Sequence, residues 1–374
     1  MHIGIDGRAA KWYRGTGIGT YTYQLIYNLN LVDKINDYSV FLPNNSKLDN
    51  LNSNFKFHNV LQDTQENFWE EVSLPNILKD ENLNIYHVPQ NGVGLPNHLN
   101  SSAVITLHDI IPLRMPETVS DRYLKIFNND MKKIIDKVQG IITVSNFSKD
   151  DISKEFNCPK DKIFVTHLAA EDIYKPIDKI KCKKFLKLNY CINDNFILYV
   201  GGFSPRKNIT GLIEAFSLLK DIYKQDLKLV IVGKQGISYE KYKSRSIELG
   251  IENDVLFPGF IPLDHMPIFY NACDTLVYPS FYEGFGLPPL EAMACGTPVI
   301  ASNCTSIPEI LGESALLINP ENIYEIMDAM LNVLINIDLR IKLTVAGIEK
   351  SKAYNWNKTA LDTLSAYNFI NKMN

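Results

Sequence analysis

The chain has 374 residues, of which 45% are hydrophobic and 21% are charged, and its formal net charge is −4 at pH 7. This length and composition predict two ordinary globular domains, and the acidic balance gives no support to a nucleic-acid-binding function. There is no run of about 18 apolar residues and no signal-peptide pattern, so the sequence favours a cytoplasmic protein without a membrane span.

Short apolar runs alternate with helical patterns along the chain. The runs lie at residues 2–6, 39–42, 85–87, 103–107, 140–144, 196–200, 228–232, 255–257, 275–278 and 298–301. Near-continuous apolar runs are typical of strands buried on both faces of a sheet. Helical patterns lie between them, for example at 19–31, 210–221 and 287–294. The alternation predicts an α/β protein with parallel, doubly wound sheets.

The alternation occurs twice, with a break at residues 174–184. This stretch contains Pro176 and many lysines and is predicted to be a linker. We therefore expect two Rossmann-like domains, 1–175 and 176–355, followed by a helical segment at 356–374. A cleft between two such domains is a common place for a ligand.

The first motif, RGTGIGT at 14–20, follows the first predicted strand and opens a helix. Its glycines, Gly15, Gly17 and Gly19, allow a bound group to come close to the backbone, and a helix N-terminus favours an anion. A phosphate-binding loop and a plain tight turn both fit this pattern. The spacing differs from the Gly-x-Gly-x-x-Gly dinucleotide motif, which argues against a dehydrogenase.

The second motif, GGFSPRKN at 201–208, directly follows the strand predicted at 196–200. Arg206 can place two N–H groups on phosphate oxygens, and Lys207 adds a compact positive charge. A solvated basic pair is the alternative. Because two glycines, a strand end and two cations coincide, the motif favours binding of a diphosphate.

The third motif, EGFGLPPLEAMACGTP at 283–298, follows the strand predicted at 275–278. The prolines after Leu287 suit a first helical turn, and Gly296 suits a helix end. Glu283 and Glu291 could form a glycosidase pair. We favour instead carboxylates that accept hydrogen bonds from sugar or ribose hydroxyls beside a phosphate-binding helix N-terminus.

The fourth motif, TLHD at 106–109, lies at the end of the strand predicted at 103–107. Open α/β sheets bind ligands at the carboxyl ends of their strands. A lone histidine is more often structural, but His108 followed by Asp109 at a strand end favours a functional role.

Together these motifs resemble the retaining glycosyltransferases of family 4, which have the GT-B fold. YPSFYEGFGLPPLEAMACGTPVIAS at 278–302 is similar to the family's Glu-x7-Glu signature. LHDIIPL at 107–113 and YVGGFSPRKNI at 199–209 resemble its mannosyltransferase-type subgroup, which builds bacterial surface polysaccharides such as O-antigen. The fold implied is two Rossmann-like domains facing across a cleft, with the last helix crossing back to the first domain.

The resemblance implies a role for each matching residue. Arg206 and Lys207 would bind the diphosphate, Glu283 the sugar hydroxyls and Glu291 the ribose, while His108 would lie beside the sugar. The implied catalytic set is His108, Arg206, Lys207 and Glu283. The implied donor-binding set is Gly17, Gly202, Glu283, Gly284, Phe285, Gly286, Leu287 and Glu291.

The activity implied is retaining transfer of a hexose from a nucleotide diphosphate sugar, with GDP-mannose as first choice, to a glycan or lipid-linked saccharide. Family members need no catalytic metal, and the chain has no Asp-x-Asp pair, so no metal or cofactor is expected. Two alternatives are a nucleotide-sugar epimerase of the same fold and a non-catalytic nucleotide-sugar binding module.

A basic, amphipathic helical pattern spans residues 121–137. Its lysines and arginine could rest on anionic lipid at the inner membrane face and present a lipid-linked acceptor. Alternatively, its apolar residues are ordinary core and its cations are solvated.

Overall fold

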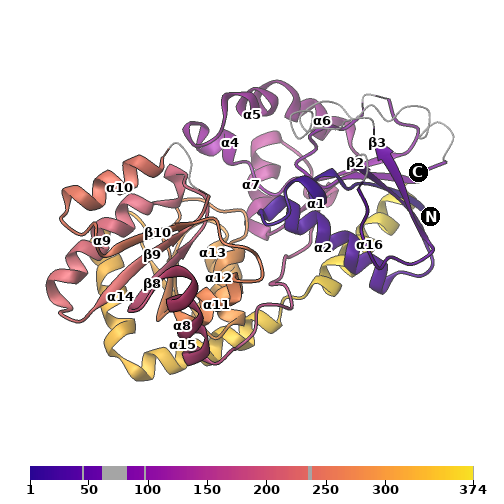
Figure 1. The fold of residues 1–374 in the computed structure, drawn as a ribbon. Helices are drawn as coiled ribbons and strands as arrows, with labels where there is room; N and C mark the ends of the chain where they lie inside the picture. The colour runs from indigo at the N-terminus through magenta and orange to yellow at the C-terminus, as the bar shows by residue number, and fades with distance from the viewer. Residues whose placement is uncertain (44–45, 61–81, 97, 235–237, 374) are drawn as a thin grey trace. The chain divides into compact units, whose positions relative to one another are not determined.

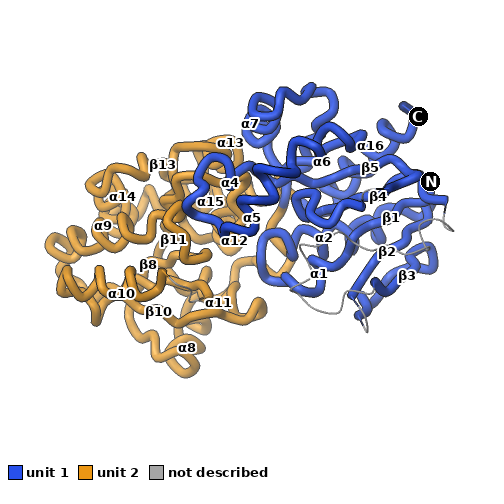
Figure 2. Tube along the Cα trace, turned by 90° about the horizontal axis from the view of Figure 1, so that it is seen from above, with its two compact units in different colours: residues 1–168, 355–374 blue, residues 169–354 orange. Residues whose placement is uncertain are grey.

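The computed structural model describes residues 1–43, 46–60, 82–96, 98–234 and 238–373 (Figure 1). It divides into two compact units, one formed by Met1–Leu168 with Asn355–Asn374 and the other by Ala169–Tyr354 (Figure 2). Each unit is built on its own parallel sheet. Over these ranges, none of the helices combines the length and the apolar character needed to cross a membrane.

The first unit has a seven-stranded sheet in the order β3-β2-β1-β4-β5-β6-β7. Its strands are β1 (His2–Asp6), β2 (Asp37–Pro43), β3 (Phe55–Val60), β4 (Ile85–Val88), β5 (Ser102–Thr106), β6 (Gly140–Thr143) and β7 (Ile163–Val165). Its helices are α1 (Arg8–Trp12), α2 (Gly17–Val32), α4 (Ile111–Arg114), α5 (Asp121–Ile126), α6 (Lys132–Lys137), α7 (Asn146–Phe156) and α16 (Trp356–Lys372). The direction of strand addition reverses between β1 and β4, which creates a topological switch point.

The second unit has a six-stranded sheet in the order β10-β9-β8-β11-β12-β13. Its strands are β8 (Asn195–Val200), β9 (Leu227–Val232), β10 (Val255–Gly259), β11 (Thr275–Tyr278), β12 (Val299–Ser302) and β13 (Leu316–Ile318). Its helices are α8 (Lys179–Tyr190), α9 (Ile209–Ile222), α10 (Tyr239–Glu248), α11 (Met266–Ala272), α12 (Leu287–Ala294), α13 (Ile307–Leu311), α14 (Ile323–Ile335) and α15 (Ile337–Lys352). The switch point of this sheet lies between β8 and β11.

The prediction of two Rossmann-like parallel sheets is confirmed. Each apolar run identified in the sequence forms a strand, and the structure adds three that were not predicted, β3, β7 and β13. The linker predicted at 174–184 is wrong in its second half, because α8 begins at Lys179 and its side chains Cys182 and Leu186 are buried. Many lysines there reflect the exposed face of a helix, not an unstructured connection.

The C-terminal helix α16 is part of the first unit and packs against α2. The Tyr367 hydroxyl lies 2.6 Å from Nδ1 of His87, and Thr359 donates to the carbonyl of His167. Ile370 fills the space above Gly140, where a Cβ would stand 2.3 Å from its Cδ1. Buried apolar and polar contacts together therefore fix the last helix to strands β4 and β6.

Candidate active site

The site in the second unit is built by the two loops at the switch point of its sheet. After β8, Pro205–Lys207 form a 3-10 turn, and Asn208 follows with a left-handed backbone (φ 54°). The Asn208 side chain accepts from the amide of Gly211 and so caps α9. After β11, the loop through Glu283 leads into α12. The carboxyl ends of β8 and β11 are neighbours, so their loops meet at the place where such sheets bind ligands.

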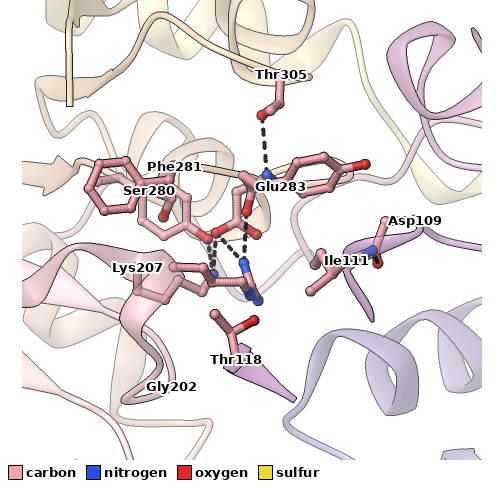
Figure 3. Close-up of polar contacts among 12 residues, drawn as sticks. Asp109, Ile111, Thr118, Gly202, Lys207, Ser280, Phe281, Glu283 and Thr305 are labelled. Carbon is pink, nitrogen blue, oxygen red and sulfur yellow. Dashed lines mark hydrogen bonds and ion pairs between the residues drawn. The ribbon is translucent and has the colours of Figure 1, made fainter. Parts of the chain in front are cut away.

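Glu283 joins the two loops through two cations (Figure 3). Its Oε1 lies 2.8 Å from Nη1 of Arg206 and 2.5 Å from Nζ of Lys207. Lys207 also donates to the Tyr278 hydroxyl at 2.6 Å, and its Nζ lies 4.8 Å from the centroid of that ring. Arg206 Nη1 donates to the carbonyl of Tyr282 at 2.9 Å. The sequence predicted these residue types, but not that the carboxylate would pair with both cations.

Burial and charge oppose each other at Glu283, whose exposed fraction is 6%. Burial disfavours its ionised form, but the charges of Arg206 and Lys207 outweigh burial and lower its pKa to about 2. The carboxylate is therefore ionised at neutral pH. One carboxylate against two cations leaves this cluster with net positive charge, which suits an anionic ligand.

Two residues after β12 hold the Glu283 loop through its backbone. Thr305 Oγ1 accepts from the Glu283 amide at 3.1 Å (Figure 3). The single hydroxyl hydrogen of Ser306 is shared between the carbonyls of Glu283 and Phe285, which lie 2.9 Å and 3.2 Å from its Oγ. Sequence reasoning missed Tyr278, Thr305 and Ser306. The signal available was the polar segment directly after the strand at 298–301, since neighbouring parallel strands end at the same edge.

The N-terminus of α12 begins at Leu287, with Gly286 before it in a left-handed conformation (φ 101°). This positive φ favours glycine, and a Cβ at Gly286 would also stand 2.6 Å from Cδ1 of Ile307, which would have to move. Gly284 and Gly286 are buried, and Phe285 packs edge-on against Tyr354. The first amides of a helix have no partner within it. Pro288 and Pro289 carry no N–H, so the first turn of α12 offers only the amides of Leu287 and Leu290.

Glu291 lies in α12, one turn beyond its start, and is half-buried. Its Oε2 accepts from the Tyr270 hydroxyl at 2.7 Å. Burial, followed by the charge of Glu291, raises the pKa of Tyr270 well above its usual range, so the phenol stays a hydrogen-bond donor. The structure thus anchors Glu291 on α11, separately from the ion pairs of Glu283.

His108 stands two residues beyond the end of β5 in the first unit and is buried. Its Nε2 lies 3.0 Å from the carbonyl of Pro89, and its ring meets the edge of Tyr21 at 4.8 Å between centroids. A carbonyl only accepts, so Nε2 carries the proton and Nδ1 is the acceptor. Burial lowers the pKa of His108 to about 4, so the ring is neutral at pH 7.

The glycines predicted to approach the donor differ in their surroundings. Gly17 is the first residue of α2, capped by the Thr16 side chain, and a Cβ there would meet nothing within 4 Å. Gly202 has the same open space. At Gly19, by contrast, a Cβ would stand 1.9 Å from the Tyr13 carbonyl oxygen, so this glycine is required by packing.

The structure brings Arg206, Lys207 and Glu283 into direct contact and places Gly202, Gly284–Leu287 and Glu291 in the same unit. Gly17 and His108 belong to the other unit. Within the described ranges, no three His, Cys, Asp or Glu side chains gather closely enough to hold a metal ion.

Two family models match the chain. The model described as glycosyl transferases group 1 matches residues 186–350, and the one described as glycosyltransferase family 4 matches residues 16–170. The O-antigen chain mannosyltransferase B of Escherichia coli is 32% identical over 374 residues, covering 96% of this chain and 97% of the relative.

Solved structures share the fold over the whole chain. Sucrose-phosphate synthase from Thermosynechococcus elongatus superposes with a TM-score of 0.79 at 20% identity, covering 100% of both chains. HepE from Anabaena, solved in complex with UDP and glucose, has a TM-score of 0.71 at 16% identity, covering 98% of both chains. At these identities the likeness concerns the fold.

Proposed function

The chain belongs to glycosyltransferase family 4 and has the GT-B fold, and on this premise we propose that it transfers a hexose from a nucleotide diphosphate sugar with retention of anomeric configuration. We propose GDP-mannose as the donor and mannose as the transferred sugar. The proposed acceptor is a glycan or lipid-linked saccharide of an O-antigen-like polysaccharide. The E. coli relative, a mannosyltransferase by name and matched over 97% of its length, supports this choice.

One observation carries the proposal: the buried cluster of Arg206, Lys207 and Glu283 at the switch point between β8 and β11. We propose that the two cations, together with the backbone amides of Gly286 and Leu287 at the start of α12, bind the diphosphate. Glu283 contacts both cations through Oε1, so we assign the sugar hydroxyls to Oε2. Glu291, held by Tyr270, would accept from the ribose hydroxyls.

The proposed mechanism follows from where charge develops. As the bond from the anomeric carbon to the phosphate oxygen breaks, negative charge grows on the diphosphate, and Arg206 and Lys207 stabilise it. Preorganised donors of this kind are worth about 3–4 kcal/mol each at other sites. The donor phosphate would take the acceptor's proton during attack on the same face. His108 would contact sugar hydroxyls as a neutral ring, with Nδ1 accepting and no metal taking part.

A donor screen followed by product analysis tests the proposal. Ligand binding to the folded state raises its thermal stability by mass action. We expect GDP-mannose to raise the melting temperature more than UDP-, ADP- or dTDP-sugars. With a mannose-containing acceptor and EDTA present, proton NMR should show an α-linked product from the α-linked donor.

A β-linked product would contradict retention, and loss of activity in EDTA would contradict metal independence. Release of an epimerised nucleotide sugar without acceptor would favour the epimerase alternative. Binding without hydrolysis or transfer would favour a non-catalytic module.

A further inference from the structure

Helix α8 is strongly basic although the chain as a whole is acidic. It carries five lysines and no acidic residue, whereas the net charge of the chain is −4. Cys182 and Leu186 form its buried face, and the helix packs against α11. It lies at the margin of the second unit (Figure 2). The opposite side of α8 is therefore available for a partner.

The exposed side of α8 combines charge with apolar surface. Successive helical residues turn by about 100°, which places Ile180, Lys181, Lys184, Lys187 and Leu188 on one arc opposite Cys182. Ile180 is 79% exposed and Leu188 is 72% exposed. We call these five residues the α8 face. The two aliphatic side chains are about two turns apart on the same arc, so they flank the three lysines of the α8 face.

The lysines of the α8 face are not neutralised by the protein. Lys179 pairs with Asp274 at 2.8 Å, and Lys183 donates to Asn195, but both lie outside the face. Across the part of the chain that the structure describes, Lys181, Lys184 and Lys187 have no ion-pair partner. Their charge is therefore available to an anionic surface.

The basic helical segment at 121–137 differs from α8 both in the pairing of its lysines and in the burial of its apolar residues. Residues 121–137 carry five basic and three acidic residues, and Lys132 pairs with Asp136 while Lys133 pairs with Asp130. Its apolar residues Phe127 and Ile135 belong to the core of the first unit. The interpretation of this segment as ordinary core with solvated cations therefore accounts for both its buried apolar residues and its surface lysines.

We propose that the α8 face docks the protein on an anionic lipid surface. Lysines around exposed Ile180 and Leu188 match what an interfacial helix needs, because the lysine stems can lie along the lipid while the ammonium groups contact headgroups. Each basic residue close to an anionic membrane strengthens binding by about fivefold. The three lysines together therefore strengthen binding strongly, but the attachment stays reversible. The inference does not depend on which sugar the enzyme transfers.

Co-sedimentation of the full chain with vesicles tests this surface. We expect binding to phosphatidylcholine vesicles containing roughly one third phosphatidylglycerol, and weak binding to phosphatidylcholine alone. The triple variant Lys181→Gln, Lys184→Gln, Lys187→Gln should reduce the partition coefficient by about 100-fold. The pair Ile180→Ser and Leu188→Ser should weaken the part of binding that persists at high salt.

A matched control removes the same charge elsewhere: Lys125→Gln, Lys132→Gln and Lys133→Gln, which should bind within about twofold of wild type. All these side chains except Ile180 and Leu188 are exposed cations, so circular dichroism should confirm unchanged folding. The proposal is overturned if wild type ignores anionic vesicles, if it binds neutral vesicles equally well, or if the control loses as much binding as the α8 variant.

Discussion

At the level of single residues, Glu283 matters because it is the counter-charge of two cations, one of them buried. Replacing it by glutamine would leave Lys207, 7% exposed, without its anion. Removing one partner of a buried ion pair costs about 3 kcal/mol or more. We expect Glu283→Gln to lower the free energy of unfolding by about 3 kcal/mol in urea titrations and to abolish transfer.

The matched control is Glu248→Gln, which removes an exposed carboxylate paired with Arg245 at 2.8 Å. Exposed pairs contribute at most about 1 kcal/mol, so its unfolding curve should nearly overlay that of wild type. Equal stability of both variants would mean that Glu283 does not balance the cations as described.

The buried ring of His108 leads to a prediction about how stability depends on pH. Its pKa is lowered by burial from an ordinary 6.5 to about 4, so between these values the unfolded chain takes up a proton that the folded chain does not. The contribution of His108 to stability is therefore present above pH 6.5 and is lost as the pH falls towards 4. Ring NMR should show the Nε2–H tautomer and a midpoint near pH 4. A midpoint near 6.5 would contradict the buried, Pro89-bonded ring.

The sequence predicted which residue types act but not how they contact one another. Arg206, Lys207 and Glu283 could be singled out because each follows a predicted strand. Their shared contact through Oε1 could not, because it depends on β8 and β11 being neighbours. The Tyr278 hydroxyl that accepts from Lys207 was hidden in an apolar strand, where its pattern predicts only core.

At the level of elements, the start of α12 depends on the backbone of Gly286. Alanine there would take a left-handed conformation that costs about 1–2 kcal/mol, with an added clash against Ile307. We expect Gly286→Ala to destabilise the protein by at least about 2 kcal/mol and to weaken donor binding.

Gly202→Ala is the contrasting change in the other loop, because its Cβ would enter open space. Its thermal stability should stay near that of wild type. If Gly202 lies against the donor, as the family resemblance implies, donor affinity should still fall. Unchanged affinity in calorimetry would remove Gly202 from the donor site.

Elements were predicted best where they are long and buried. The apolar runs of β1, β8 and β9 have the pattern of strands buried on both faces. β7 and β13 have three residues each, too few to show a period, and β3 at the edge of its sheet mixes Lys56 and His58 with apolar residues. Local pattern cannot identify strands that exist only because a neighbour pairs with them.

At the scale of the whole molecule, the two sheets share the Rossmann strand order, and in the second unit the motifs after β8 and β11 lie at the switch point of the sheet. The alternation of apolar runs with helical patterns predicted the two sheets, and the motifs at strand ends predicted where their ligand-binding loops lie. Membership of α16 in the first unit depends on contacts such as Tyr367 with His87, 280 residues apart in the chain. No local pattern contains that information.

Calorimetric titration with GDP and UDP tests the central claim most directly, using wild type, Arg206→Gln and Arg245→Gln. In Arg206→Gln, Lys207 still pairs with Glu283, so the loop keeps its counter-charge. Loss of a charge-assisted hydrogen bond predicts about 10- to 100-fold weaker binding of GDP. Arg245→Gln removes a half-buried cation of α10 that pairs with Glu214 and Glu248, away from the Glu283 cluster, and should bind GDP as wild type does. Unchanged affinity in Arg206→Gln, or no binding of either nucleotide to wild type, would contradict a diphosphate site at the β8–β11 switch point.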